Sequence, residues 1–362
     1  MTSTAIRVVT GPANYYSYPG ALQELENLYT PAQLESAVWI FGERAIAAAT
    51  PFLPAAFNVA GAKHIAFGGH CSESAVGQLC AQAGDDRQVV IGVGGGALLD
   101  TAKVVARRLG VPLVAIPTIA ATCAAWTPLS VWYNDEGQAL RFEIFNDANH
   151  LVLVEPTIIL RAPQEYLLAG IGDTLAKWYE AVVLSPQPEN LPLTVRLGIE
   201  AALSIRNVLL NSSEQALADQ RRGELTQVFF DVVDAIIAGG GMVGGLGERY
   251  TRVAAAHAVH NGLTTLPQTE RFLHGTKVAY GILVQSELLG QRDVTEQLIA
   301  AFARFNLPTS LKALGVDIHH HADVEKVIAR TLAPFESIHA LSVPLSAESL
   351  RSAIERVEAL SA

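Results

Sequence analysis

The hydrophobic pattern of the first 160 residues alternates short apolar runs with stretches of helical spacing. Short apolar runs bounded by turn residues are typical of the buried strands of a parallel sheet. The runs predict strands at Ile6–Thr10, Ala37–Phe41, His64–Phe67, Gln88–Gly92, Leu113–Ile116 and Leu151–Val154. Helical patterns lie between them, at Leu22–Leu28, from Ala45 onwards, at Ser72–Ala83 and at Ala97–Leu109. This half of the chain is therefore predicted to be an α/β domain with a mostly parallel sheet.

A polar turn interrupts this pattern before its last strand. Asn134–Gly137 lies between two strand-like segments, Val131–Tyr133 and Ala139–Ile144, and predicts a small β-hairpin. Beyond about Ile158 no strand-like alternation recurs, and helical patterns follow one another. They cover Asp173–Leu184, Thr194–Leu210, Gln215–Val233, Thr251–Asn261, His274–Gly290, Thr295–Phe305, Asp323–Leu332 and Ala347–Leu360. We therefore expect an α/β domain at 1–160 and an all-helical domain at 161–362.

Three consecutive glycines, Gly94, Gly95 and Gly96, separate a predicted strand from the helix that follows it. Glycine lets backbone N–H groups approach an oxyanion closely, and the start of a helix adds partial positive charge. The loop therefore favours a phosphate site, although a tight strand-to-helix turn also uses glycine. The usual dinucleotide fingerprint lies at the first strand, with an acidic residue about 20 positions later. Here Pro117 stands at that distance, so we expect a nucleotide site of another kind.

Composition and charge exclude several classes of function. The chain has 362 residues, of which 50% are hydrophobic and 17% are charged, as expected for a globular protein with a large core. Its formal net charge of −10 argues against nucleic acid or an anionic membrane as a partner. Cys71, Cys80 and Cys123 lack paired spacing and favour a reducing cytoplasm. We see no signal-peptide pattern, and the apolar run Ala235–Gly247 is too short to span a bilayer.

The helical half contains candidate metal ligands. Asp173 follows Gly172 at the predicted start of a helix, where a carboxylate also serves as an N-terminal cap. His257 and His260 lie three residues apart and share a helix face, and His274 opens the next predicted helix. A lone buried histidine is more often a core residue, but three within eighteen positions favour a metal site. One carboxylate and two imidazoles would hold Zn²⁺ or Fe²⁺ with open positions, and the spacing does not choose between them.

Two further features bear on the chemistry of this site. The same ligand set occurs in non-haem iron oxygenases, but the glycine loop disfavours that class, because such oxygenases need no nucleotide. Lys177 lies four residues after Asp173, on the same face of the predicted helix. It is either a solvated lysine or a cation that pairs with a substrate carboxylate or phosphate.

Five ordered motifs resemble the glycerol dehydrogenase branch of the iron-containing alcohol dehydrogenase superfamily, and together they span nearly the whole chain. They read GVGGGALLDTAK, PTIAATCAAWTPLSVWY, GIGDTLAKW, AAAHAVHNG and HGTKVAYG. The resemblance implies a dehydroquinate synthase-like architecture, with an N-terminal nucleotide domain and a C-terminal helical domain. It also implies that Asp173, His257 and His274 are the metal ligands, with His260 in the site but not a first-choice ligand. The positions that would contact the dinucleotide are Gly94, Gly95, Gly96, Asp100, Thr118, Thr127, Leu129 and Tyr133.

The chain departs from the family pattern at three places. Cys123 stands where glycerol dehydrogenases carry an aspartate that holds the polyol, and Lys177 stands where iron alcohol dehydrogenases carry a fourth ligand histidine. Both changes favour an acid substrate, because they remove a carboxylate and add a cation. NAD-preferring members often have an aspartate after the strand that corresponds to Ala37–Phe41. Here Gly42-Glu43-Arg44 follows, a pattern that accepts a 2′-phosphate, although Glu43 remains a possible partner for a 2′-hydroxyl.

These features predict a metal-dependent oxidoreductase that interconverts a small 2-oxo acid and its 2-hydroxy acid. We expect NADP(H) in preference to NAD(H), Zn²⁺ in preference to Fe²⁺, Lys177 as the anchor of the substrate carboxylate, and His260 or an ordered water as the proton source. We also expect a cytoplasmic homo-oligomer. Three alternatives stay open: an NAD-dependent glycerol or other diol dehydrogenase, a carbon–oxygen lyase related to dehydroquinate synthase, and a nucleotide-binding sensor without turnover.

Overall fold

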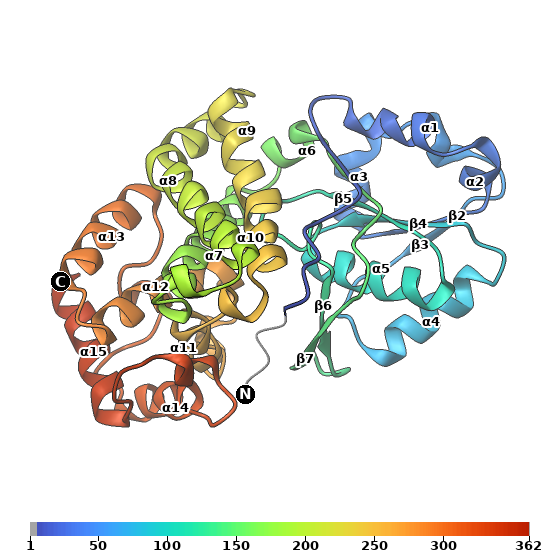
Figure 1. Cartoon of the computed structure of the whole chain (residues 1–362). Helices are drawn as coiled ribbons and strands as arrows, with labels where there is room; N and C mark the ends of the chain where they lie inside the picture. Colours follow the sequence, from blue (N-terminus) through green and yellow to red (C-terminus); the bar gives the residue numbers. More distant parts are fainter. Residues whose placement is uncertain (1–5, 362) are drawn as a thin grey trace. The chain divides into compact units, whose positions relative to one another are not determined.

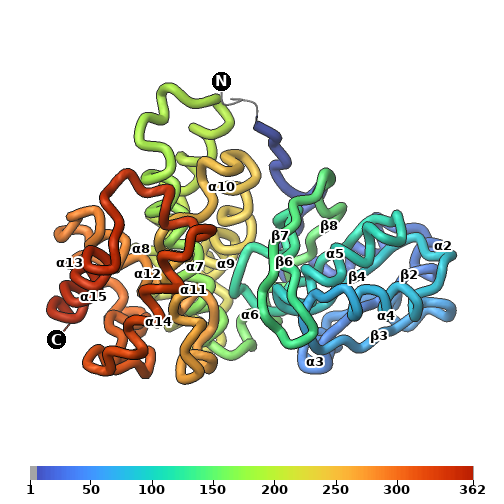
Figure 2. The backbone as a smooth tube through the Cα atoms, turned by 90° about the horizontal axis from the view of Figure 1, so that it is seen from below, coloured from blue at the N-terminus to red at the C-terminus, as the bar shows by residue number. Residues whose placement is uncertain are grey.

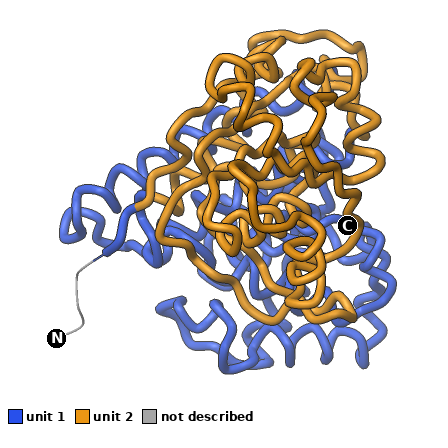
Figure 3. Tube along the Cα trace, turned by 90° about the vertical axis from the view of Figure 1, so that its right-hand side faces the viewer, with its two compact units in different colours: residues 1–8, 164–218, 246–362 blue, residues 9–163, 219–245 orange. Residues whose placement is uncertain are grey.

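The computed structural model describes residues 6–361, which divide into two compact units (Figures 1 and 3). The first, here called the α/β unit, contains residues 9–163 and 219–245. The second, the helical unit, contains residues 6–8, 164–218 and 246–361. The expected division at residue 160 stays a prediction, and the compact units differ from it in grouping 219–245 with the α/β part.

A parallel sheet organises the α/β unit, as the apolar runs predict. The described strands are β1 (Asn14–Ser17), β2 (Ala37–Phe41), β3 (Lys63–Ala66), β4 (Val89–Gly94), β5 (Leu113–Pro117), β6 (Leu129–Tyr133), β7 (Ala139–Ile144) and β8 (Leu151–Val154). Six of these form one sheet in the order β1-β8-β5-β4-β2-β3, with every neighbouring pair parallel. The predicted hairpin is confirmed as the separate antiparallel pair β6–β7.

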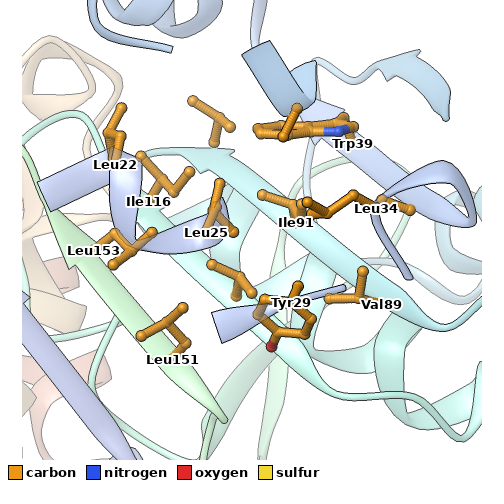
Figure 4. Packing of buried hydrophobic residues seen from close by; sticks show 14 of the residues in the cluster. Leu22, Leu25, Tyr29, Leu34, Trp39, Val89, Ile91, Ile116, Leu151 and Leu153 are labelled. Atoms are coloured by element: carbon orange, nitrogen blue, oxygen red, sulfur yellow. The ribbon is translucent and has the colours of Figure 1, made fainter. Parts of the chain in front are cut away.

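Helices cover both faces of this sheet. Those of the α/β unit are α1 (Glu24–Leu28), α2 (Pro31–Glu35), α3 (Glu43–Ala49), α4 (Glu73–Ala83), α5 (Gly96–Leu109), α6 (Pro156–Leu160), α9 (Gln227–Asp234), a π-helical segment (Ala235–Gly239) and most of α10 (Gly240–Gly247). Trp39 belongs to the same buried cluster as Leu22 and Leu25 on one face (Figure 4), whereas its neighbour Ile40 belongs to the cluster of Val76 of α4 on the other. Burial on both faces explains why the strands are continuously apolar.

The predicted strand Ile6–Thr10 is wrong, because the first strand is β1 and residues 6–10 pair with no strand in the described structure. Their backbone instead lies against α10, where a Cβ on Gly245 would come within 2.5 Å of the Val9 carbonyl oxygen. The Thr10 carbonyl accepts a hydrogen bond from the Trp126 indole at 2.8 Å. This apolar run thus forms no ladder, because α10 packs against the carbonyl of Val9 and the Trp126 indole donates to that of Thr10.

Long helices build the helical unit. They are α7 (Gln164–Leu184), α8 (Leu193–Arg222, which continues into the first unit), α11 (Ala255–Leu263), α12 (His274–Leu288), α13 (Arg292–Phe305), α14 (His321–Thr331) and α15 (Ala347–Leu360). Helices α7, α11 and α12 lie side by side in Figures 1 and 2, with α12 in contact with both of the others. This group carries the candidate metal ligands.

Several helix boundaries differ from the prediction, and two of these differences concern glycine. Asp173 does not start a helix, because α7 begins at Gln164 and runs through Gly170 and Gly172, so the cap interpretation is wrong. The predicted helix Gln215–Val233 is also wrong, because α8 continues to Arg222 and ends at Gly223, whose φ of 69° is left-handed. A new helix, α9, then begins after the N-cap Thr226.

The apolar segment in the middle of the chain forms a longer helical stretch than its composition suggests. Residues Gln227–Tyr250 are continuously helical over 24 residues, and their most apolar 18-residue window has a mean hydropathy of 1.5. By length and composition alone this stretch is apolar enough to cross a membrane. The run Ala235–Gly247 is therefore part of a longer helix, and the prediction that it is too short to span a bilayer is wrong. Half of the stretch's most apolar window is buried inside the structure, and core helices of water-soluble proteins have the same length and composition.

Close helix contact at two glycines brings the candidate ligands together. A Cβ on Gly275 of α12 would lie 1.9 Å from the Ala169 carbonyl oxygen of α7, and a Cβ on Gly172 would lie 2.5 Å from the Gly275 carbonyl oxygen. No side chain fits between backbones this close, so both positions require glycine. The contact places Asp173 of α7 beside His274 at the start of α12.

We therefore expect Gly275→Ala to destabilise the protein by about 1–3 kcal/mol, because the added methyl group forces α7 and α12 apart. Urea unfolding followed by circular dichroism measures the change. The matched control is Gly77→Ala in the middle of α4, where a Cβ would meet no atom within 4 Å. This control is expected to be neutral or to stabilise by up to about 1 kcal/mol. Equal effects of the two substitutions would contradict the close-contact argument.

Candidate functional site

Asp173, His257 and His274 converge in the helical unit, as the sequence predicts. Asp173 Oδ1 lies 3.4 Å from Nε2 of His257 and 3.2 Å from Nε2 of His274. Each residue offers one ligand atom, and the three atoms lie within 4.8 Å of one another. The three side chains come from three different helices, α7, α11 and α12, so the packing of those helices determines the geometry of the cluster.

The cluster fits a divalent cation. Asp173 is buried, and its Oδ1 has no hydrogen-bond partner of good geometry among the described residues. Burial alone would raise the pKa of the Asp173 carboxyl, but the facing imidazoles of His257 and His274 and the charge of Lys177 hold it well below its usual range. A buried carboxylate oxygen that faces two imidazole nitrogens is a donor set suited to a first-row metal ion.

Glu180 orients His257 from behind. It lies seven residues after Asp173 in α7 and is fully buried. Its Oε2 lies 2.7 Å from Nδ1 of His257, and its Oε1 accepts the backbone N–H groups of Ala254 at 2.7 Å and His257 at 3.1 Å. Because a carboxylate accepts here, Nδ1 carries the proton and Nε2 is the nitrogen available to a metal.

The charge of Glu180 also sets the protonation of His257. Burial works against a charged ring, but Glu180 and Asp173 outweigh it and raise the pKa of His257 to about 9. In the metal-free protein a proton therefore sits on the nitrogen that would bind the ion, and metal binding must displace it.

A longer chain of hydrogen bonds orients His274. Its Nδ1 lies 3.0 Å from Nε2 of His260, whose Nδ1 lies 3.0 Å from Oδ1 of Asn261. The Asn261 amide nitrogen donates to both carboxylate oxygens of Glu336, at 2.9 and 3.2 Å, and Arg330 pairs with that carboxylate. Since Asn261 donates through its nitrogen, its oxygen accepts from His260, which in turn accepts from His274.

The chain therefore leaves a lone pair on Nε2 of His274, the atom that faces Asp173 at 3.2 Å. Two acceptors do not face each other at this distance without a cation between them, and a proton or a metal ion meets that need. His260 itself stays neutral, because burial and the neighbouring charges of His274 and Lys277 hold its pKa well below its usual range.

Sequence reasoning found the three ligands and His260 but missed Glu180, Asn261 and Glu336. Glu180 had a readable signal, because residues seven apart lie on the same face of a helix. Glu336 had none, because it lies 75 residues from Asn261 and outside any periodic element. Lys177, one turn after Asp173 in α7, is half-buried.

The glycine loop lies in the α/β unit at the carboxyl end of β4. Strands β2 and β4 are neighbours, and the chain leaves β2 for α3 on one face of the sheet and β4 for α5 on the other. Such a reversal in strand order opens a crevice at the carboxyl ends of the strands, where nucleotides bind in open α/β sheets. Gly95 is the N-cap of α5 and no side chain caps this helix, so its first N–H groups are available to a phosphate.

Packing explains part of the glycine requirement. A Cβ on Gly95 would lie 2.8 Å from Ile119, and one on Gly94 would lie 3.0 Å from Leu98. The turn would thus use glycine even without a ligand. Gly96 is less crowded, because its nearest neighbour would be Thr122 Oγ1 at 3.2 Å.

Asp100 and Lys103 hold the segment that follows β5. The carboxylate of Asp100 lies 2.8 Å from Nζ of Lys103 and accepts the Val131 N–H at 3.1 Å. The buried Lys103 ammonium donates to the carbonyl oxygens of Ala124, Thr127 and Leu129. The sequence analysis missed Lys103. It expected Asp100 to contact a cofactor, whereas in the structure the Asp100 carboxylate bonds to Lys103 and to the Val131 N–H. The cofactor role of Asp100 stays a prediction.

The other expected dinucleotide positions all lie in the α/β unit. Thr118 follows β5, Thr127 precedes β6, and Leu129 and Tyr133 are the end residues of β6. Gly42 caps α3 directly after β2, and the side chains of Glu43 and Arg44 in the first turn of α3 are exposed.

Comparison with known proteins identifies the class of protein. The model of the iron-containing alcohol dehydrogenase family matches residues 12–156. Hydroxycarboxylate dehydrogenase A of Escherichia coli K12 is 71% identical over 362 residues, all of both chains. Glycerol dehydrogenase of Thermotoga maritima is 32% identical and covers 96% of this chain and 95% of its own. The crystal structure of a probable glycerol dehydrogenase from Sinorhizobium meliloti 1021 superposes with a TM-score of 0.85, at 26% identity, over 98% of this chain and 99% of that one.

The fold and the triad define a metal-binding dehydrogenase. The chain belongs to the iron-containing alcohol dehydrogenase family, and within it to the group that contains the glycerol dehydrogenases. Among these relatives it is similar over its whole length to the hydroxycarboxylate dehydrogenase of E. coli.

We expect Glu180→Gln to weaken metal binding by about 10–100-fold, because the amide no longer fixes the proton on Nδ1 of His257. Competition with a chromogenic chelator measures the dissociation constant without any activity assay. Glu165→Gln, an exposed carboxylate in the first turn of the same helix, is the matched control. The orienting role of Glu180 is wrong if both variants bind metal as the parent does.

Proposed function

We propose that the protein reduces small 2-oxo acids to 2-hydroxy acids with a reduced nicotinamide dinucleotide. The observation that carries the proposal is the 71% identity over the full length to a hydroxycarboxylate dehydrogenase, together with the intact triad of Asp173, His257 and His274. The reaction is a hydride transfer to the C2 carbonyl carbon and a proton transfer to its oxygen, so one equivalent of the reduced nicotinamide is oxidised for each acid formed.

Asp173, His257 and His274 hold one divalent ion in this proposal, with Zn²⁺ preferred to Fe²⁺. Two imidazole nitrogens and one carboxylate oxygen suit Zn²⁺ and leave a position open. When bound, the ion polarises the substrate carbonyl and the nicotinamide supplies the hydride. Glu180 and the His260–Asn261 chain keep both ligand rings oriented toward this point.

Lys177 anchors the substrate carboxylate. It lies one helical turn from Asp173, and its charge contributes to the low pKa of that carboxyl. The positive charge of the ammonium therefore acts at the metal-ligand cluster. An ammonium forms a charge-assisted hydrogen bond with a carboxylate. Cys123 supports the same substrate class, because the resemblance places an aspartate there in enzymes that hold a polyol.

The proton source follows from the contacts of His260. Both of its ring nitrogens are engaged, with His274 and with Asn261, so the ring faces no substrate directly. Of the two proton sources expected, an ordered water fits this geometry better. His260 then acts through His274 as a positioning residue.

We further propose NADP(H) as the preferred cofactor and the cytoplasm as the location. No acidic residue stands between β2 and Glu43, and the exposed guanidinium of Arg44 lies in the first turn of α3. A guanidinium in this place pairs with a 2′-phosphate, whereas an aspartate would bond a 2′-hydroxyl. The location rests on Cys71, Cys80 and Cys123, none of which forms a disulfide in the described structure.

Loss of absorbance of NADPH with a panel of 2-oxo acids tests the activity, and chelation followed by metal addition tests the role of the ion. We expect Lys177→Ala to lower kcat/KM for 2-oxo acids by about 10–100-fold, since it removes a charged hydrogen bond worth about 1.5–3 kcal/mol. The turnover of a neutral diol by the same variant is the internal control and should change little.

Three outcomes contradict the proposal in different ways. An unchanged KM for 2-oxo acids in Lys177→Ala would exclude the anchoring role. NAD-linked oxidation of glycerol without turnover of any 2-oxo acid would favour the diol dehydrogenase instead. Tight dinucleotide binding without turnover in the presence of any metal would favour the nucleotide-binding sensor.

Replacement of Arg44 separates the two nicotinamide cofactors. We expect Arg44→Ala to raise the dissociation constant of NADPH by about tenfold, because one charged contact to the 2′-phosphate is lost. Binding is followed by quenching of intrinsic fluorescence in the absence of substrate. NADH, which lacks this phosphate, is the control ligand and should bind the variant as it binds the parent. Equal weakening of NADPH and NADH binding would show that Arg44 does not act on the 2′-phosphate.

A further inference from the structure

The hairpin β6–β7 lies in the α/β unit (Figure 1) and has two outer edges. The outer edge of β6 is closed. The Tyr133 N–H donates to the Cys71 carbonyl oxygen at 2.9 Å, and the Val131 N–H donates to Asp100 at 3.1 Å. The Leu129 carbonyl accepts from the Lys103 ammonium. Side chains and a loop thus occupy the polar groups along the outer edge of β6.

The outer edge of β7 is open. Within residues 6–361, the backbone of Ala139–Ile144 pairs with β6 and with no further strand. In an antiparallel pair, alternate residues turn their N–H and C=O groups away from the partner strand, so a row of such groups faces solvent here. Open edges are templates for another strand and are usually protected by charge, proline or a bulge.

An apolar strip accompanies this open edge. Leu140, Phe142 and Ile144 are 64%, 57% and 41% exposed, and Phe142 and Ile144 share one face of the hairpin. Leu140 lies at an irregularity in the pairing with β6, where Tyr133 pairs with Ala139 and Trp132 with Arg141. The side chains between them, Arg141 and Glu143, lie on the opposite face and remain 55% and 42% exposed. Arg141 and Glu143 lie 3.7 Å apart within the strand, and Arg141 also lies 3.9 Å from Glu73. β7 therefore presents a backbone edge, three large apolar side chains and a partly exposed pair of opposite charges.

We propose that β7 pairs antiparallel with β7 of a second copy of this chain, about a two-fold axis at Phe142. A two-fold axis perpendicular to the hairpin keeps each side chain on its own face, so the axis must pass midway between the two copies of one residue. With the axis at Phe142, Arg141 of each copy lies opposite Glu143 of the other. Leu140 lies opposite Ile144, and the two Phe142 side chains meet. The result is a continuous four-stranded sheet.

Charge selects this register over its neighbours. An axis at Arg141 would place two guanidinium groups opposite each other, and an axis at Glu143 would do the same with two carboxylates. Opposite charges across a strand pair are stabilising, and like charges are destabilising. The order apolar, cation, apolar, anion, apolar along Leu140–Ile144 is complementary to itself only when it is read antiparallel about its centre. The strand's own sequence thus identifies a second copy of the chain as the partner.

Disulfide trapping tests the register. Opposite residues of an antiparallel pair have Cα atoms about 4.5–5.5 Å apart, within the reach of a disulfide. Phe142→Cys is therefore expected to form a covalent dimer under mild oxidation, visible on a non-reducing denaturing gel. In the matched control Leu140→Cys, the two introduced thiols are roughly 14 Å apart along the strands and stay at the background of the parent protein. Equal trapping of both variants, or none of either, would overturn the proposal.

A charge exchange distinguishes pairing from damage to the hairpin. In the Phe142→Cys background, Arg141→Glu alone and Glu143→Arg alone each place like charges opposite each other and should lose the covalent dimer. A mixture of the two variants, one with a tag that changes its mobility, restores opposite charges and should give the mixed dimer. Failure of the mixture while each variant keeps the parent's circular dichroism spectrum would overturn the proposal. The gel needs neither metal nor substrate, so the result is independent of the proposed function.

Discussion

Asp173 places a carboxylate charge in the packed interior of the helical unit, and the surrounding structure is arranged around that charge. The glycine contact between α7 and α12 sets its distance from His274, and Glu180 sets the orientation of His257. A buried charge is costly unless opposite charge and hydrogen bonds meet it. Here two imidazole nitrogens approach Oδ1 without hydrogen bonds of good geometry, so the packing of three helices favours a cation at one point.

The parallel sheet was predictable because its strands are buried on both faces. Ala37–Phe41 reads as one apolar run since Trp39 and Ile40 enter different cores, and the structure confirms that strand residue by residue. Ile6–Thr10 has the same local character but finds no neighbouring strand. The local pattern indicates that a segment can form a strand. Whether it pairs in a sheet or packs unpaired against a helix depends on contacts with residues distant in the sequence.

Glycine was the residue whose role the sequence left most ambiguous. Gly172 suggests a helix start, yet it lies inside α7, where its missing side chain admits the backbone of α12. Gly223 follows Arg221 and Arg222, a combination typical of a helix C-terminus, and it ends α8 in a left-handed conformation where the prediction continued the helix. The site shows the same limit. Spacing revealed Asp173, His257 and His274, but Glu336 reaches them only through Asn261 and His260, which no periodicity connects to it.

The two orienting systems decide how a metal ion competes with protons. A metal binds the lone pair of Nε2, and both rings offer that atom because Nδ1 donates away from the centre, directly to Glu180 or through His260 and Asn261 toward Glu336. Without an ion the charges of Glu180 and Asp173 outweigh burial and raise the pKa of His257 to about 9, so a proton occupies the metal's place at neutral pH. Glu180 therefore makes His257 a better ligand and a stronger base at once. Metal binding must release this proton, and the affinity of the centre falls as the solution becomes more acidic.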